Sequence, residues 1–168
     1  NHAKPTLRPT TQESYSQWIE VHIIPAIGQI PLNKLTQADC QKFLNALKSN
    51  GRKIHRDSKG AELAEKSVRN CYHVLKMSLD RAVTDGLIKK NPSTGCKLPP
   101  LKTKEMKILS KEEIQRFLIQ AKEEGLYELF LLELTTGLRR GEILALTWDD
   151  LNSKTGELRI NKQFTPAG

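Results

Sequence analysis

Apolar residues in the first hundred positions recur at intervals of three and four, which predicts three amphipathic helices. The first begins at a cap formed by Thr10 or Thr11, and Pro25 and Gly28 are expected to end it. The second covers about 36–50 and the third about 65–84. The residues expected to face the core are Tyr15, Trp18, Ile19 and Ile23 in the first helix, Cys40, Phe43, Leu44 and Leu47 in the second, and Val68, Cys71, Tyr72, Leu75, Leu79, Ala82 and Val83 in the third.

The remaining residues predict further helices followed by a strand. Ser110 and Glu113 form a capping box at the start of one helix, and an apolar helix follows over 126–134. Gly137 ends the apolar helix, and after another amphipathic run the alternation over 156–164 is typical of a strand. The fold class is therefore mainly α. The expected inward residues are Ile114, Phe117, Leu118 and Ala121, then Ile143, Leu144, Leu146 and Trp148.

A stretch rich in proline and lysine, KLPPLKTKEMK, separates these two parts of the chain. We expect a helical domain at 1–98, a basic linker at 99–107 and a second domain at 108–168, cut from a longer protein. The net charge is +8, and it lies in the first hundred residues, which hold 16 Lys and Arg against 8 Asp and Glu. The rest is neutral, with 11 of each sign. This split favours a polyanion-binding module beside a different one, with ordinary basic solubility as the alternative.

The three cysteines, Cys40, Cys71 and Cys96, are far apart and form no Cys-x-x-Cys pair. A disulfide framework or a zinc site is therefore not expected, and the histidines show no metal-ligand spacing. Cys40 and Cys71 fall on apolar helix faces, so we expect them to be buried thiols in a reducing cytoplasm, and no cofactor is expected. No apolar run approaches the length that a membrane span requires.

Polar residues on the second helix suit a reader of DNA grooves. Gln37, Gln41 and Asn45 lie between Lys34 and Lys48 on the side opposite the apolar residues. Amides can hydrogen-bond base edges, while lysines bind phosphates. A solvated polar face is the alternative interpretation.

The third helix carries a stripe of one charge sign, since no acid interrupts it between Lys66 and Lys76. Solvated helices usually mix both signs, so this stripe favours phosphate contact. The full set of expected DNA-binding residues outside the second helix is Arg52 and Lys53 in a basic loop, Lys66, Arg69, His73 and Lys76 in the stripe, Lys102, Lys104 and Lys107 in the linker, and Arg140.

The segment TTGLRRGEILALTWDDL, residues 135–151, carries the most specific chemistry. Arg139, Glu142, Ile143 and Leu146 are spaced to share one helix face, which places an arginine on or beside the buried side. A buried arginine needs a partner, and Glu142 can supply one. A plain helix–turn–helix corner with a surface arginine is the alternative.

The whole segment closely resembles the box of tyrosine recombinases, the phage-integrase family, that carries the first catalytic arginine. The matching positions are Thr136, Gly137, Arg139, Glu142, Leu146, Trp148, Asp150 and Leu151. Phrases at 24–32, 87–92 and 109–113 resemble the family as well, most of all integrases of conjugative transposons and temperate phages. The resemblance implies a helical core-binding (SAM-like) domain followed by the N-terminal part of an α+β catalytic domain, with the two domains closing around duplex DNA.

The resemblance also implies the chemistry. In this family a tyrosine attacks a phosphodiester and forms a 3′-phosphotyrosyl link, without metal or nucleotide, and mobile DNA elements are integrated or excised. It makes Arg139 catalytic, with Glu142 holding it in position. Lys162 is a candidate for the general-acid lysine, although the family places that lysine in a hairpin after the strand that holds Lys162.

The implied partners are double-stranded DNA, other integrase protomers and an excision (directionality) factor. The family's His-x-x-Arg motif and nucleophile are not expected within these residues, because Tyr15, Tyr72 and Tyr127 lie in the wrong places. We therefore expect a recombinase fragment that binds DNA without cutting it. A non-enzymatic helical DNA-binding regulator and a helical protein-interaction module are the alternatives.

Overall fold

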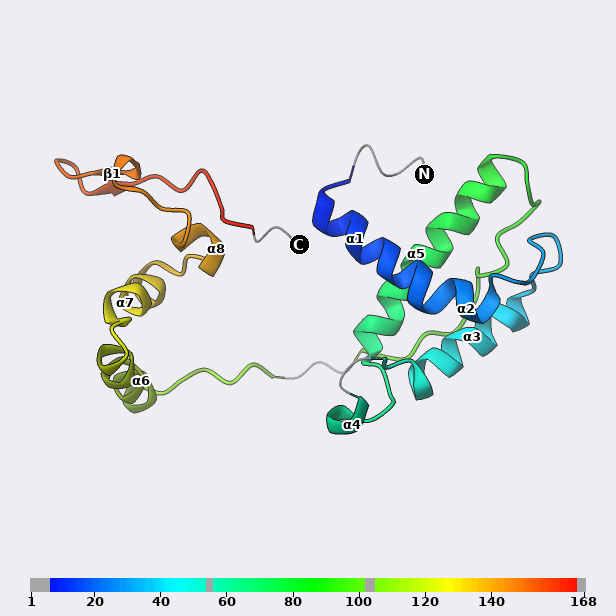
Figure 1. Cartoon of the computed structure of the whole chain (residues 1–168), viewed down its shortest axis with the longest axis horizontal. Coiled ribbons are helices and arrows are strands. Elements are labelled where there is room, and N and C mark those ends of the chain that lie inside the picture. Colours follow the sequence, from blue (N-terminus) through cyan, green and yellow to red (C-terminus); the bar gives the residue numbers. More distant parts are fainter. Residues whose placement is uncertain (1–6, 54–55, 102–104, 166–168) are drawn as a thin grey trace. The chain divides into compact units, whose positions relative to one another are not determined.

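The computed structural model describes residues 7–53, 56–101 and 105–165 and is mostly helical. The chain divides into two compact units, Asn1–Lys104 and Glu105–Gly168. Unit 1 is a bundle of helices, and unit 2 contains shorter helices and a small hairpin (Figure 1).

The first helix of unit 1 is longer than predicted and changes its geometry along its length. It consists of α1 (Pro9–Trp18), a π-helical turn η2 (Ile19–Ile23) and α2 (Ile24–Ile27) (Figure 1). The prediction of a threonine cap was wrong: Arg8 is the N-cap, and Pro9 takes the first helical position that suits proline. The prediction that Pro25 and Gly28 end the helix was right for Gly28, which is the C-cap of α2, and wrong for Pro25. The proline lies in the first turn of α2, directly after the π turn, where a missing N–H is tolerated.

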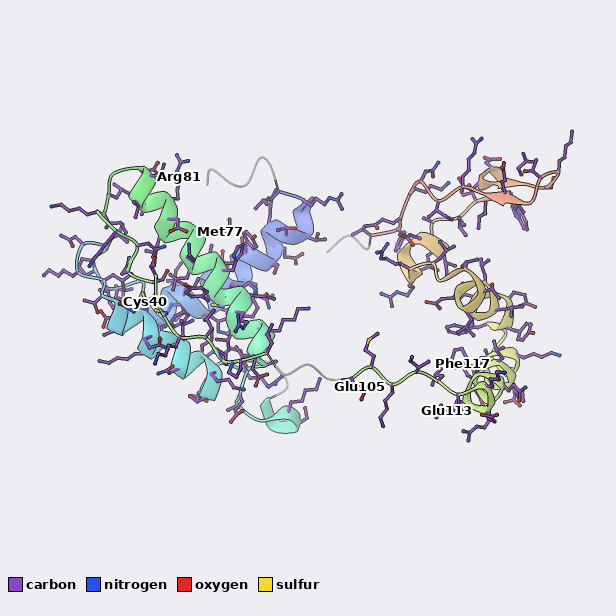
Figure 2. The ribbon with its side chains drawn as sticks, turned by 180° about the vertical axis from the view of Figure 1, so that it is seen from behind. Cys40, Met77, Arg81, Glu105, Glu113 and Phe117 are labelled. Carbon is purple, nitrogen blue, oxygen red and sulfur yellow. The ribbon has the colours of Figure 1, made fainter. Side chains whose placement is uncertain are left out.

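The other two long helices follow the sequence closely. Helix α3 (Gln37–Asn50) begins at a capping box in which Thr36 and Asp39 bond each other's backbone, and α5 (Glu65–Thr84) has the predicted bounds. The four predicted core residues of α3 are all buried, and Cys40 among them lies where α3 packs against α5 (Figure 2). In the described part of the chain, no helix is long and apolar enough to cross a membrane.

The core of unit 1 lies between α3, α5 and the first helix. Burial of α5 matches the prediction except that Val74 is also buried, while Tyr72 and Val83 are only half-buried. The loop between α3 and α5 contains the short helix α4 (Arg56–Lys59), and its neck is closed by a hydrogen bond from the Arg52 amide to the Ala61 carbonyl.

The segment after α5 returns along the bundle and is fixed to it. The side chain of Asn91 donates to Asp80 Oδ1 at 2.6 Å and to the Lys76 carbonyl at 3.1 Å, and Tyr72 donates to the carbonyl of the fully buried Ser93 at 3.2 Å. Cys96 and Leu98 then pack against the core. The chain is thus held on unit 1 well beyond the end of α5.

Unit 2 begins as predicted. Helix α6 (Lys111–Glu123) starts at the Ser110–Glu113 capping box, and α7 (Tyr127–Thr136) ends at Gly137, whose φ of 68° places it in the left-handed region that glycine adopts freely. The two helices contact each other through Phe117 and Phe130, whose rings meet edge to face at 4.8 Å between centroids.

The end of unit 2 differs from the prediction. The expected amphipathic helix is only the single turn α8 (Arg140–Ile143), followed by a 3-10 turn η3 (Trp148–Asp150), and Trp148 is 87% exposed. The expected strand is a two-residue pairing of β1 (Leu151–Asn152) with β2 (Glu157–Leu158). A helix this short derives little stability from its own hydrogen bonds and depends on packing. Among the described residues of unit 2, however, only Ala121 and Ile143 are buried apolar side chains.

Candidate nucleic-acid interface and arginine site

Arg139 and Glu142 form a closed pair at the start of α8. Arg139 is the N-cap residue, and its backbone N–H donates to Glu142 Oε2 at 2.8 Å. Its guanidinium Nη1 donates to the other carboxylate oxygen at 3.0 Å. The two bonds from Arg139, the backbone one first, hold the pKa of the Glu142 carboxyl below its usual value. The carboxylate therefore stays charged and holds Arg139 at its backbone N–H and at its guanidinium.

The predicted burial of Arg139 was wrong. Its side chain is 84% exposed, against 18% for Glu142. Helical spacing places Arg139 beside the buried face only if Arg139 is helical, but its ψ of 147° is extended, so its side chain does not follow the face of α8. The predicted partnership with Glu142 is confirmed. A guanidinium has five N–H donors, and the ion pair uses one nitrogen, so an accessible oxyanion can still be bound.

Lys162 lies after β2 rather than on a strand, and it is bound within unit 2. Its Nζ lies 2.8 Å from Asp150 Oδ2 and donates to Thr147 Oγ1 at 3.0 Å. Lys162, together with the backbone and hydroxyl of Thr147, lowers the pKa of Asp150 to about 2. Asp150 is buried, so this lysine neutralises a carboxylate that would otherwise be costly to bury.

Gly141 lets the segment that follows Lys162 lie close against α8. The Phe164 amide donates to the Gly141 carbonyl at 2.7 Å, and a Cβ on Gly141 would lie 2.8 Å from the Phe164 carbonyl oxygen. Only glycine permits that approach without a shift. Sequence reasoning missed this contact, although a glycine inside a helical start was a signal of close backbone approach.

The polar face of α3 lines a groove of about 840 Å³ in unit 1. Its walls include Gln37, Gln41, Asn45 and Lys48 on α3 and the extended segment 95–99. The Gln41 amide is already bonded: its Nε2 donates to Asn45 Oδ1 at 3.0 Å and to the Lys97 carbonyl at 3.1 Å, and its Oε1 accepts from the Lys97 amide at 2.7 Å. Gln37 is exposed at the start of the helix, next to Gly95.

Several of the predicted phosphate-binding residues are also occupied. Lys48 Nζ lies 3.4 Å from Glu62 and 3.2 Å from Glu65, and it donates to the Leu63 carbonyl at 3.1 Å. These contacts, with Glu65 first, raise the Lys48 pKa. Arg52 donates to the Glu62 carbonyl at 3.1 Å. Lys48 and Arg52 thus fasten the neck of the α3–α5 loop.

The stripe on α5 divides into accessible and bonded residues. Lys66 and His73 are exposed, whereas Arg69 donates to the Pro99 carbonyl at 3.1 Å and Lys76 pairs with Asp80 at 2.6 Å. Asp80, one turn after the stripe, therefore neutralises Lys76, the last lysine of the stripe. Lys34, Lys53, Lys107 and Arg140 are exposed, and Lys102 and Lys104 lie outside the described residues.

Comparison with known proteins identifies relatives for both units. The family profile "Phage integrase, N-terminal SAM-like domain" matches residues 1–48. The ICEBs1 integrase of Bacillus subtilis is 29% identical over 160 residues, which cover 94% of this chain and 40% of that protein. A XerC-like tyrosine recombinase of Caldanaerobacter subterraneus is 36% identical over 107 residues, covering 60% of this chain and 27% of that protein. The chain thus spans less than half the length of these relatives.

A solved structure shares the fold across both units. It is the Tn1549 transposon integrase in complex with circular intermediate DNA, with a TM-score of 0.75, 21% sequence identity, and coverage of 94% of this chain and 50% of that one. A second structure of that integrase, in complex with transposon right end DNA, gives a TM-score of 0.69. The arrangement of helices described above is therefore the integrase arrangement.

Proposed function

Because the chain belongs to the tyrosine recombinase family, we propose that it supplies the DNA-binding unit and the first catalytic arginine of a site-specific recombinase. The recombinase integrates or excises a mobile element. The observation that carries this proposal is the geometry of Arg139, whose exposed guanidinium and backbone N–H are both bonded to the Glu142 carboxylate. The integrase with the same fold was solved bound to transposon DNA, which supports DNA as the substrate.

Arg139 is proposed to bind the scissile phosphate. When a tyrosine attacks a phosphodiester, its hydroxyl gives up a proton and a 3′-phosphotyrosyl link forms, while the 5′-oxygen takes up a proton and leaves as a hydroxyl. In between, negative charge accumulates on the oxygens of the pentacoordinate phosphate. A guanidinium fixed in advance stabilises that charge, and removing one such donor costs on the order of 10²–10³ in rate. Glu142 positions the guanidinium without occupying all of its N–H donors.

Unit 1 is proposed to bind duplex DNA through its accessible lysines and through His73. Lys34, Lys53, Lys66 and His73 are exposed on the unit whose sequence carries the whole basic excess. Each lysine bound to a phosphate releases a counterion, so binding depends steeply on salt. Gln37, exposed at the groove, is the best-placed base reader.

The tyrosines of this chain are not proposed as nucleophiles. Tyr15 contacts Met77, and Tyr72 bonds the Ser93 carbonyl. Tyr127 begins α7 while Arg139 follows its other end, and ten helical residues at about 1.5 Å each separate them by roughly 15 Å. The chain by itself is therefore expected to bind DNA and to form no covalent adduct.

The test is adduct formation by the full-length protein on a nicked suicide DNA substrate. Arg139→Lys is expected to leave DNA binding largely intact and to suppress the phosphotyrosyl adduct, because lysine keeps the charge but not the planar donor geometry. Arg140→Lys is the matched control and should be much milder. Loss of the adduct in the control alone would place the catalytic arginine at position 140. No effect of either variant would contradict the recombinase assignment.

A further inference from the structure

Two side chains expected to contact DNA are instead bonded to the segment that leaves unit 1. Gln41 on α3 binds the backbone N–H and the backbone carbonyl of Lys97 with the two ends of its amide. Its remaining N–H donates to Asn45. A glutamine amide has two N–H donors, and both are used, so Gln41 has no donor left for a base.

A second fastening lies on the other long helix. Arg69 of α5 donates from Nε to the Pro99 carbonyl at 3.1 Å. The residue between the two fastened positions, Leu98, packs against the core of unit 1. The segment 97–99 is therefore held from α3 on one side and from α5 on the other, by groups that are 56 and 30 residues away in sequence.

We propose that Gln41 and Arg69 are positioning residues that clasp the start of the interdomain linker and remain on it when DNA is bound. Pro99 and Pro100 follow the clasped residue Lys97, and the proline ring fixes φ near −65°. The direction given to the backbone at Lys97 is thus passed on to the chain leaving unit 1. The clasp therefore sets the direction in which the backbone leaves Pro99.

The clasp has a direct readout in this chain, the hydrogen exchange rate of the Lys97 amide. Gln41→Ala removes the acceptor of that amide, and exchange at Lys97 should become roughly fivefold faster, the ratio that corresponds to a net hydrogen bond of about 1 kcal/mol. Gln37→Ala is the matched control: it makes the same change one turn earlier on α3 and should leave Lys97 unaffected. Gln41→Glu keeps the Oε1 acceptor and should retain most of the protection.

The second fastening is tested by proteolysis. Trypsin cleavage after Lys97, followed by mass spectrometry, should be faster in Arg69→Ala than in the parent chain. Lys66→Ala, which removes an exposed cation one turn away on the same helix, should cleave at the parent rate. Unchanged exchange at Lys97 in Gln41→Ala, or unchanged cleavage in Arg69→Ala, would overturn the clasp.

Measurements of DNA binding distinguish a clasp role of Gln41 from a base-reading role. Affinities of Gln41→Ala for a panel of duplexes should keep the parent's order of preference, and a changed order would overturn the claim that the clasp persists on DNA. The functional consequence rests on the proposed recombinase activity: in the full-length protein, Gln41→Ala should lower adduct formation more than DNA affinity. The exchange and proteolysis results do not depend on that activity, so a failure of the proposed function would be seen separately.

Discussion

Gly141→Ala is the substitution for which the structure predicts an effect opposite to the usual one. Gly141 lies inside α8, where replacing glycine by alanine normally stabilises a helix by about 0.5–1 kcal/mol. Here the added Cβ would lie 2.8 Å from the Phe164 carbonyl oxygen, closer than such atoms approach each other, and the neighbour is backbone.

The contact should outweigh the gain in helix propensity. Forcing a methyl group into an occupied position costs about 1–3 kcal/mol. If segment 159–164 moves away instead, the Phe164–Gly141 hydrogen bond is lost at about 0.5–1.5 kcal/mol, and Lys162 is drawn from Asp150. With the helix gain of about 0.5–1 kcal/mol subtracted, the close contact leaves α8 less stable by up to about 2 kcal/mol, which is up to roughly a 30-fold loss of protection. If the segment moves away instead, the net loss is smaller, up to about 1 kcal/mol.

The assay is hydrogen exchange at the Ile143 and Leu144 amides, which bond the carbonyls of Arg139 and Arg140. The control is the same substitution in a chain that ends at Gln163, which lacks the Phe164 carbonyl but keeps Lys162. There alanine should increase protection. If alanine increases protection in both chains, residues 159–164 do not lie against α8 and the close approach is refuted.

Three further outcomes follow from the contacts. Lys162→Ala should raise the pKa of Asp150 from about 2 toward its ordinary value of 3.8 in a carboxyl NMR titration. Because the folded pKa is depressed, the stabilisation by Asp150 is present above about pH 4 and is lost as the pH falls toward 2; an unchanged titration would remove Lys162 as its cause. Lys66→Ala should weaken binding to all duplexes and reduce the slope of log K against log salt by about one unit. Lys48 is already paired with two carboxylates, so Lys48→Ala should change that slope less. Gln37→Ala should change base preference by about 1–3 kcal/mol, and equal weakening on every sequence would assign it a backbone contact only.

Local signals in the sequence were sufficient for much of the fold. The capping box at Ser110 and the helix end at Gly137 depend on neighbouring residues, and both were predicted correctly. The four buried residues of α3 were predicted because a long helix with one apolar face has one way to pack.

Features that depend on distant contacts or on a change of backbone geometry were missed. The burial of Arg139 was predicted from a helical spacing that the extended N-cap does not follow. The bonds of Gln41 involve Lys97, 56 residues away, so its polar side chain looked identical to that of a solvent-facing or base-reading residue. The roles of the individual DNA-binding residues stay predictions, since their partners are outside the chain.

The π-helical turn at Ile19–Ile23 has a consequence for how the length of this chain can vary. A π turn accommodates one residue more than an α turn does. The side chains of the flanking α1 and α2 therefore keep the orientation that they would have in a regular helix one residue shorter. Deleting one residue here would leave Trp18 and Ile27 directed at the core. The same deletion in α5 would rotate every later side chain by about 100°. Sequences one residue shorter should therefore accept the gap within this turn and nowhere in α5.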